Sequence, residues 1–270
     1  MTSAVFNKYD SLVVGTGNIL ENEEFKKAKN PTQEMLICVK PRIIELEQKQ
    51  GTLSSNTKDL VSLVCDETEV NGIENEAGSI KIVAKIFLNE FAENSLNEAI
   101  EYLLKNCSTT PSVILAYHPT SRTDSEKFIW ADNNIKCKGN FKFLWKKLRV
   151  ARDAGIIGQL GIADMDLDTI LDIFDDKNFD FTILQINTQT CCVVPPELQQ
   201  FCKDHDIQLL THSDPQVIFP SHHLDEISLK DFKMKWTVRY LETLVCRGIL
   251  TKKGFIVKFV KALNVKKSDI

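Results

Sequence analysis

Two adjacent thiols are the first residues in this sequence whose types and spacing could do chemistry. Cys191 and Cys192 are neighbours among eight cysteines in 270 residues, and an exposed, low-pKa thiolate at either position would react with an oxidant or a partner's thiol. A disulfide between neighbours is strained, so two reduced, packed thiols are the simpler interpretation and a redox contact with a partner chain is the alternative. No cysteine pair has the spacing of a zinc site, because Cys191 and Cys192 are adjacent and Cys202 has only His205 nearby. The sequence therefore predicts no metal site.

One short glycine-rich stretch could cradle a nucleotide. Gly15-Thr16-Gly17-Asn18 lacks the third glycine of the dinucleotide fingerprint and a clear acidic partner on a following strand. This weakens the hypothesis of an open, doubly wound sheet that binds a dinucleotide.

The elements that must position any site alternate between strand and helix patterns. Short apolar runs predict buried strands at 79–88, 112–117, 156–163, 181–187 and 207–211, with amphipathic helices between them and a last helix around 236–245. Parallel neighbours need such crossovers. We predict a single-domain (β/α)8 TIM barrel over residues 1–270, with eight mostly parallel strands. A less regular polar segment at about 21–57 is expected to hold one long surface helix, and 118–138 a long loop at the functional rim.

Charge and hydropathy exclude several partner classes. The 33 basic and 37 acidic residues are scattered and give a net charge of -4, so no strong field favours nucleic acid or anionic lipid. No apolar stretch approaches a membrane span, and residues 1–10 do not resemble a signal peptide. With the cysteine usage, this predicts a cytoplasmic protein. Lys252, Lys253, Lys266 and Lys267 are interpreted as a solvated basic end, with contact to an acidic partner as the alternative.

Several segments resemble aldo-keto reductases. Ile82-Val83-Ala84-Lys85 resembles the strand that ends in that family's catalytic lysine, and Val113 to Pro119 resembles the next strand. Gly161-Ile162-Ala163-Asp164 and Gln185-Ile186-Asn187 also match, and the likeness covers roughly residues 79–254. The resemblance implies the barrel and makes Asp164, Gln185 and Asn187 weak candidates for binding a nicotinamide cofactor.

A closer resemblance within that superfamily is to the regulatory (modifier) subunits of glutamate–cysteine ligase. It is carried by the Cys-Cys-x-x-Pro-Pro element at 191–196, the Leu-Leu-Thr-His-x-Asp-Pro element at 209–215 and Arg247-Gly248-Ile249-Leu250. It implies a non-catalytic chain that forms a heterodimer with the catalytic subunit of the ligase. There it raises the affinity for glutamate and relieves feedback by glutathione, which places it in glutathione biosynthesis.

The residues that aldo-keto reduction needs are incomplete. Lys85 matches the lysine, but Tyr117 takes the position of the histidine, and His118 falls one residue later, on the opposite strand face. Upstream, only Asp66 could supply the aspartate, and the sequence has no tyrosine between Tyr9 and Tyr102. Without the tyrosine acid the developing alkoxide receives no proton. We therefore predict no catalytic residue, with Lys85 and Tyr117 as vestiges.

Three hypotheses follow. The first is the regulatory subunit, which requires no cofactor and leaves NADP binding open. The second is an NADP-dependent aldo-keto reductase with an altered active site, in which Tyr117 would have to reach Lys85. The third is a cysteine-based redox protein. Lys85, Tyr117, Asp164 and Gln185 are expected at one rim, and the candidates for partner or redox contact are Cys191, Cys192, Arg247, Lys252 and Lys253.

Overall fold

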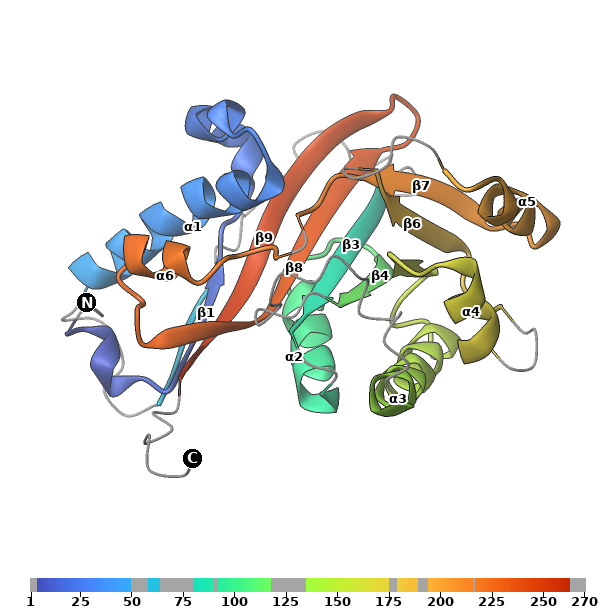
Figure 1. Cartoon of the computed structure of the whole chain (residues 1–270). Helices are drawn as coiled ribbons and strands as arrows, with labels where there is room; N and C mark the ends of the chain where they lie inside the picture. The colour runs from blue at the N-terminus through green and yellow to red at the C-terminus, as the bar shows by residue number, and fades with distance from the viewer. Residues whose placement is uncertain are drawn as a thin grey trace.

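The chain is built around one nine-stranded mixed sheet with helices on both faces (Figure 1). The structure is a computed structural model, and it describes residues 4–49, 58–63, 80–89, 92–117, 135–174, 179–188, 194–215 and 217–262. The strand order is β2-β1-β9-β8-β3-β4-β5-β6-β7. The α/β class predicted from the sequence is confirmed.

Five parallel strands form one half of the sheet. They are β3 (Ile80–Leu88), β4 (Ser112–Tyr117), β5 (Leu160–Ala163), β6 (Ile183–Asn187) and β7 (Gln208–His212). The helices between them are α2 (Glu93–Leu104), α3 (Ile135–Asp153), α4 (Leu167–Ile173) and α5 (Pro196–Asp204). The predicted strands and crossover helices of this half are thus confirmed, although β5 is shorter than expected.

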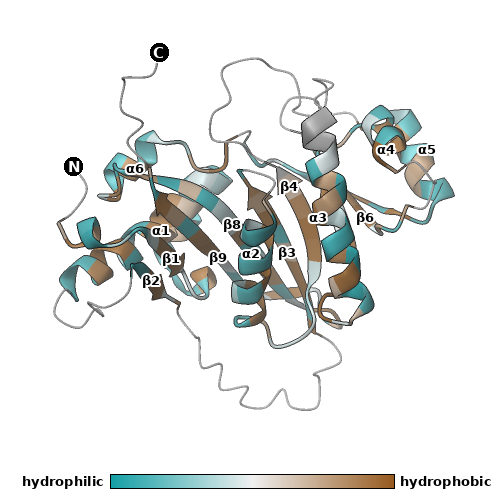
Figure 2. Cartoon of the chain, turned by 90° about the horizontal axis from the view of Figure 1, so that it is seen from below, coloured by the Kyte–Doolittle hydropathy of each residue, from teal (hydrophilic) through white to brown (hydrophobic). Residues whose placement is uncertain are grey.

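The helices of this half are amphipathic, as their sequences predict. Figure 2 shows α2 and α3 lying across one face of the sheet, with hydrophilic residues on their outer sides. Leu96, Ala99 and Leu103 of α2 and Leu144 and Leu148 of α3 are buried in one hydrophobic cluster with strand residues. That cluster fixes the strands whose ends carry the polar residues described below.

Apart from the parallel edge pair Ser11–Gly15 and Asp59–Ser62, the other half of the sheet is antiparallel, which corrects one prediction. β8 (Phe232–Leu244) and β9 (Ile249–Lys261) form a long hairpin in which β8 pairs with β3 and β9 with β1 (Ser11–Gly15). The helix predicted around 236–245 is therefore wrong. Trp236 and Tyr240 are four residues apart, a spacing that fits one face of a helix and one face of a strand equally well. Pairing along both sides of β8 decides for the strand.

The N-terminal segment supplies the opposite face. α1 (Pro31–Gln48) begins after Asn30, whose side chain accepts a hydrogen bond from the Gln33 backbone N–H. The helix predicted within 21–57 is confirmed, but it is not only a surface helix. Met35, Val39 and Ile43 are buried in a second cluster, beside α6 (His222–Glu226) in Figure 1. The short strand β2 (Asp59–Ser62) and the 3-10 turns Phe6–Lys8, Ile19–Glu21 and Glu23–Lys27 complete this half.

The sheet is not closed within the described residues. β2 and β7 form its two edges there, and the antiparallel hairpin departs from eight mostly parallel strands. Closure of a TIM barrel is neither confirmed nor excluded, and it stays a prediction. No helix in the described part of the chain is long and apolar enough to cross a membrane.

Candidate functional site

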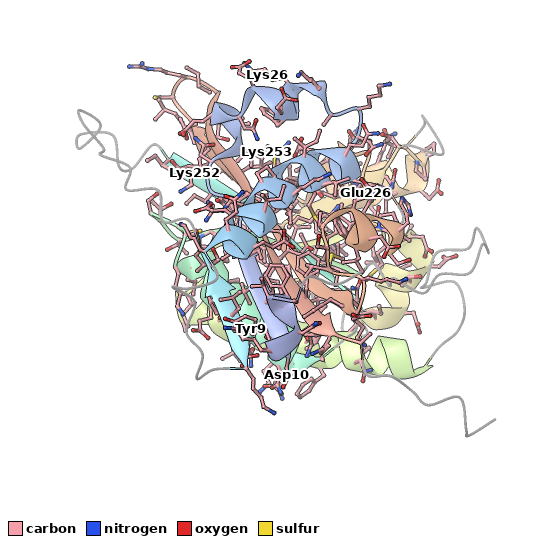
Figure 3. All side chains as sticks on the ribbon, turned by 90° about the vertical axis from the view of Figure 1, so that its left-hand side faces the viewer. Tyr9, Asp10, Lys26, Glu226, Lys252 and Lys253 are labelled. Atoms are coloured by element: carbon pink, nitrogen blue, oxygen red, sulfur yellow. The ribbon has the colours of Figure 1, made fainter. Side chains whose placement is uncertain are left out.

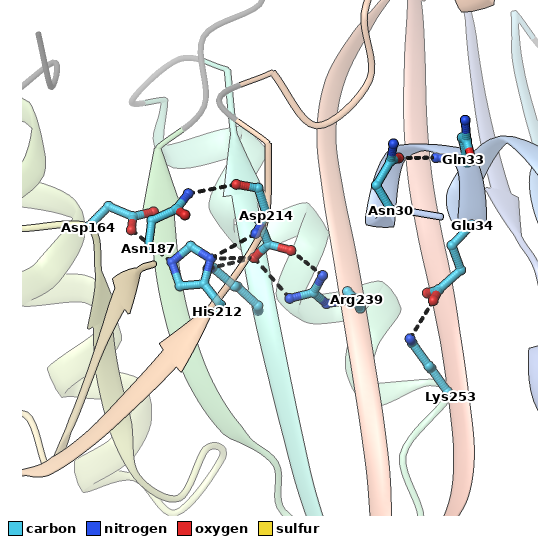
Figure 4. A network of polar contacts seen from close by, with 10 residues as sticks. Asn30, Gln33, Glu34, Asp164, Asn187, His212, Asp214, Arg239 and Lys253 are labelled. Carbon is cyan, nitrogen blue, oxygen red and sulfur yellow. Dashed lines mark hydrogen bonds and ion pairs between the residues drawn. The ribbon is translucent and has the colours of Figure 1, made fainter. Parts of the chain in front are cut away.

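A buried polar network lies at the carboxyl ends of β5, β6 and β7, and side chains from within β3 and β8 reach it (Figure 4). The carboxyl ends of parallel strands meet at one edge of a sheet, which brings together residues far apart in sequence. We call this group the carboxylate network. Its members are Lys85, Asp164, Asn187, His212, Asp214 and Arg239.

Asp214 is the centre of the carboxylate network. Its Oδ2 accepts a hydrogen bond from Lys85 Nζ at 2.8 Å, and the two side chains are 2% and 3% exposed. The Arg239 guanidinium also donates to both carboxylate oxygens, with Nη2 at 3.0 Å from Oδ2. Burial opposes the charge of Asp214, but His212, Lys85 and Arg239 outweigh it and hold the pKa of this carboxyl far below its usual range.

The register of the sheet explains why two cations face one carboxylate. Lys85 on β3 lies directly opposite Arg239 on β8, so both side chains reach the same space. Two buried like charges would repel each other without a counter-ion. Asp214 supplies that counter-ion, and Asn187 Nδ2 fixes its position by donating to its backbone carbonyl at 2.7 Å.

His212 joins the two carboxylates of the network. Its Nε2 lies 2.7 Å from Asp164 Oδ1, and its Nδ1 lies 3.1 Å from Asp214 Oδ2. The Asp214 backbone N–H also points to Nδ1 at 3.1 Å, so Nδ1 has both a donor and an acceptor within reach. When neutral, the histidine can accept a hydrogen bond from the Asp214 backbone N–H at Nδ1, and when protonated it can donate to both carboxylates.

Burial and charge set the protonation of the two basic groups in opposite directions. Burial would lower the pKa of His212, but its hydrogen bonds to Asp164 and Asp214 outweigh burial and raise it. For Lys85 burial dominates and lowers the pKa, against the attraction of Asp214 and Asp164. The network can therefore hold or release a proton at His212, while Asp214 stays ionised.

Asp164 reaches His212 through an unusual backbone conformation. It follows β5 with a positive φ of 60°, which aspartate tolerates better than most residues. Its backbone N–H donates to the Gln185 carbonyl at 2.8 Å. The turn thus aims the carboxylate across the strand ends.

Only some of the predicted site residues come together in the structure. Lys85, Asp164 and Asn187 all belong to the carboxylate network. Gln185 lies on β6, and its side-chain Oε1 is buried and has no hydrogen-bond partner among the described residues. Tyr117 ends β4 beside Leu88, and only its backbone is described. Cys191 and Cys192 lie outside the described residues.

Three residues of the network were not singled out from the sequence. The aspartate beside Lys85 was sought upstream at Asp66, which lies outside the described residues, whereas Asp214 follows β7. The His-x-Asp element at 212–214 directly after a predicted strand was the signal for two of them. Arg239 gave no usable signal, since its segment was predicted as helical.

The two lysines of the predicted basic end that the structure describes are not solvated as expected. Lys252 is 8% exposed and lies over the Tyr240 ring at 5.8 Å, and Lys253 Nζ lies 2.6 Å from Glu34 Oε2 on α1. The interpretation as a solvated basic end is therefore wrong for both lysines, because Lys252 packs over a ring of β8 while Lys253 points to the other face and pairs with α1. Lys266 and Lys267 lie outside the described residues. Arg247, at the turn between β8 and β9, is exposed.

The thiols that are described are mostly unreactive. Burial is the main cause that raises the pKa of Cys38 and Cys107 to about 12 and that of Cys202 to about 11, so little thiolate forms at neutral pH. Cys246 is exposed at the β8–β9 turn.

The chain is similar along nearly its whole length to a group of known proteins. No protein-family model matches it. Over 271 aligned residues it is 24% identical to the glutamate–cysteine ligase regulatory subunits of Mus musculus, Rattus norvegicus and Homo sapiens, and 94% of this chain and of each relative is covered. The chain resembles glutamate–cysteine ligase regulatory subunits. Because the alignment spans nearly the whole of both chains, the likeness to these regulatory subunits is not confined to a shared segment.

Proposed function

We propose that this chain is a non-catalytic regulatory subunit that binds the catalytic subunit of glutamate–cysteine ligase. The observation that carries the proposal is the similarity over 94% of this chain and of the regulatory subunits. We further propose that binding raises the affinity of the catalytic subunit for glutamate and weakens its inhibition by glutathione. The aldo-keto-reductase type of barrel is part of the same proposal.

Thermodynamics limits how such a subunit can act. It must bind the glutamate-competent state of its partner more tightly than the other state. Couplings of about 1–3 kcal/mol are usual, which is roughly a 5- to 150-fold change in affinity. Reciprocity then requires glutamate to tighten the heterodimer by the same factor.

The carboxylate network supports a structural role for its residues. Lys85, His212 and Asp214 are buried and hydrogen-bonded to one another or to neighbours, so their polar groups are occupied by protein partners. Asp164 and Asn187 are engaged in the same way, which does not fit a role for them in holding a nicotinamide. Of the cofactor candidates, Gln185 alone keeps a buried acceptor for which the described part of the chain offers no partner. The proposed function therefore gives NADP no role.

The tip of the β8–β9 hairpin is the contact surface that we propose for the partner. Val245, Ile249 and Leu250 are 57%, 50% and 39% exposed there, next to the exposed Arg247 and Cys246. Exposed apolar side chains beside an arginine are typical of protein interfaces. Lys252 and Lys253 are poorer choices, because they are engaged within the fold.

The test is a mixing experiment with the purified catalytic subunit. We expect co-elution at micromolar concentration, a lower apparent KM for glutamate and weaker inhibition by glutathione. Arg247→Glu should weaken association without lowering the melting temperature, whereas Lys233→Glu, exposed at the far end of the same hairpin, is the matched charge control. Failure to co-elute, or co-elution with unchanged kinetics for glutamate, would show that the assignment is wrong.

A second candidate function is an NADP-dependent aldo-keto reductase with an altered site. The observation in its favour is the Lys85–Asp214 ion pair with His212 beside it. This brings together a lysine, a carboxylate and a histidine that can gain or lose a proton. NADPH oxidation with common aldehydes separates the two functions. Turnover that is lost in His212→Gln would favour the reductase, and the first proposal expects none above background.

A further inference from the structure

A second group of titratable side chains lies away from the carboxylate network, on α6. His222, His223 and Glu226 each offer one ligand atom, and these atoms all lie within 4.8 Å of one another. In the described part of the chain this is the one group of three or more such side chains close enough to share an ion. Neither the predicted site nor the proposed function uses these residues.

The base of this group is fixed by packing. Phe219 is 1% exposed and its ring lies 5.7 Å from that of His223, while Leu224 and Ile227 are buried in the second hydrophobic cluster. His223 Nδ1 lies 2.7 Å from Glu226 Oε1, which orients both side chains. His223 and Glu226 are therefore oriented before any ion arrives, which lowers the entropic cost of binding.

His222 distinguishes this group from an ordinary histidine–glutamate pair on a helix surface. A histidine and a glutamate three residues apart on a helix often pair on a surface. The His222 ring centroid, however, lies only 4.1 Å from that of His223, so a second imidazole nitrogen faces the same space. Figure 3 shows Glu226 on the side of the molecule that carries α1, and the side chains of His222 and Glu226 are exposed to solvent.

Ligand chemistry identifies the class of ion. Imidazole nitrogens with one carboxylate suit zinc, copper and nickel, whereas calcium and magnesium prefer oxygen ligands. Donors bound tetrahedrally to zinc at about 2.1 Å lie roughly 3.4 Å apart, so the present spacing needs only small side-chain rotations. We propose that His222, His223 and Glu226 form a binding site for Zn²⁺, with water in the fourth position. Zinc binding at these residues would correct the prediction, made from cysteine spacing, that the chain has no metal site.

The experiment is a titration of the full-length chain with zinc chloride by calorimetry, made in a Cys246→Ser background to remove the exposed thiol. We expect a single site. Loss of an outer partner of a metal ligand typically costs 10- to 100-fold in affinity, so His222→Ala, which removes a ligand, should weaken binding at least about tenfold. His205→Ala removes an exposed histidine at the end of α5 and is the matched control.

Cobalt provides a second readout. Co²⁺ at the same site should give visible d–d absorption that disappears in His222→Ala and in Glu226→Gln. Both side chains are exposed, so the two variants should keep the melting temperature of the parent chain without metal. Zinc binding that is equally strong in His222→Ala, or that falls as much in His205→Ala, would overturn the proposal, as would no binding at all.

Discussion

At the scale of single residues, Asp214 balances the positive charges of the carboxylate network. It is the counter-ion of both Lys85 and Arg239 and lies 2% exposed as a side chain. We expect Asp214→Asn to lower the free energy of unfolding by about 3–5 kcal/mol, since it leaves two cations with one neutral partner in a buried place. Denaturant unfolding measures the change.

The control for Asp214→Asn is an exposed ion pair. Glu101 pairs with Lys105 on α2, with both side chains more than half exposed. Glu101→Gln should change stability by no more than about 0.5 kcal/mol. An Asp214→Asn effect as small as that of the control would contradict a buried, fully paired network.

The surroundings of His212 determine how its contribution to folding stability changes with pH. Its hydrogen bonds to Asp164 and Asp214 raise its pKa despite burial, and a histidine in an unfolded chain titrates at about 6.5. The stability it contributes is therefore fully present below about pH 6.5 and is lost as the pH rises through the higher folded value.

The measurement compares the parent chain with His212→Gln in denaturant unfolding from pH 6 upward. The stability difference between them should shrink as the pH rises. Asp164→Asn removes one of the hydrogen bonds that raise the pKa, so NMR titration should find a lower His212 pKa in that variant. A difference that grows with pH would show that the histidine is held neutral.

At the scale of elements, the β8–β9 hairpin approaches the turn after β1 so closely that one position has no room for a side chain. A Cβ on Gly254 would collide with the Tyr240 ring and the backbone carbonyl of Gly17, and the Tyr240 hydroxyl donates to that carbonyl. We expect Gly254→Ala to cost about 1–3 kcal/mol through this overpacking. Gly139 in α3 has open space around it, so Gly139→Ala should be neutral or stabilise by about 0.5–1 kcal/mol. Thermal unfolding of both variants tests the contrast.

At the scale of the whole molecule, one sheet joins two hydrophobic clusters. On β1, Val13 belongs to one cluster, while Leu12 and Val14 belong to the other. A strand that alternates between two cores couples them. We therefore expect a single cooperative unfolding transition, in agreement with the prediction of one domain.

Two core substitutions test this coupling. Leu148→Ala in one cluster and Phe259→Ala in the other should each cost about 2–5 kcal/mol and shift the same transition. Far-ultraviolet circular dichroism and tryptophan fluorescence should give coincident curves in both variants. Separate transitions, each moved by only one substitution, would indicate two domains.

The sequence by itself determined the local elements and the likeness to a family. Short apolar runs predicted β3, β4, β6 and β7. Strands buried on both faces, as β3 and β4 largely are, leave a nearly continuous apolar pattern. Motifs such as the one at 209–215 carried the resemblance that the relatives at 24% identity support. The resemblance also predicted Lys85 at the end of a strand and Asp164 in a turn. Asp164 does follow β5, whereas β3 continues beyond Lys85 to Leu88.

Only the tertiary structure decided which residues meet and which pattern prevails where two fit. The segment with Trp236 and Tyr240 fits helix and strand alike, and its pairing with β3 and β9 made it a strand. That pairing places Arg239 opposite Lys85, and the return of the chain after β7 brings Asp214 between them. The ion pair joins residues 129 positions apart, and local periodicity carries no information about contacts over such a distance.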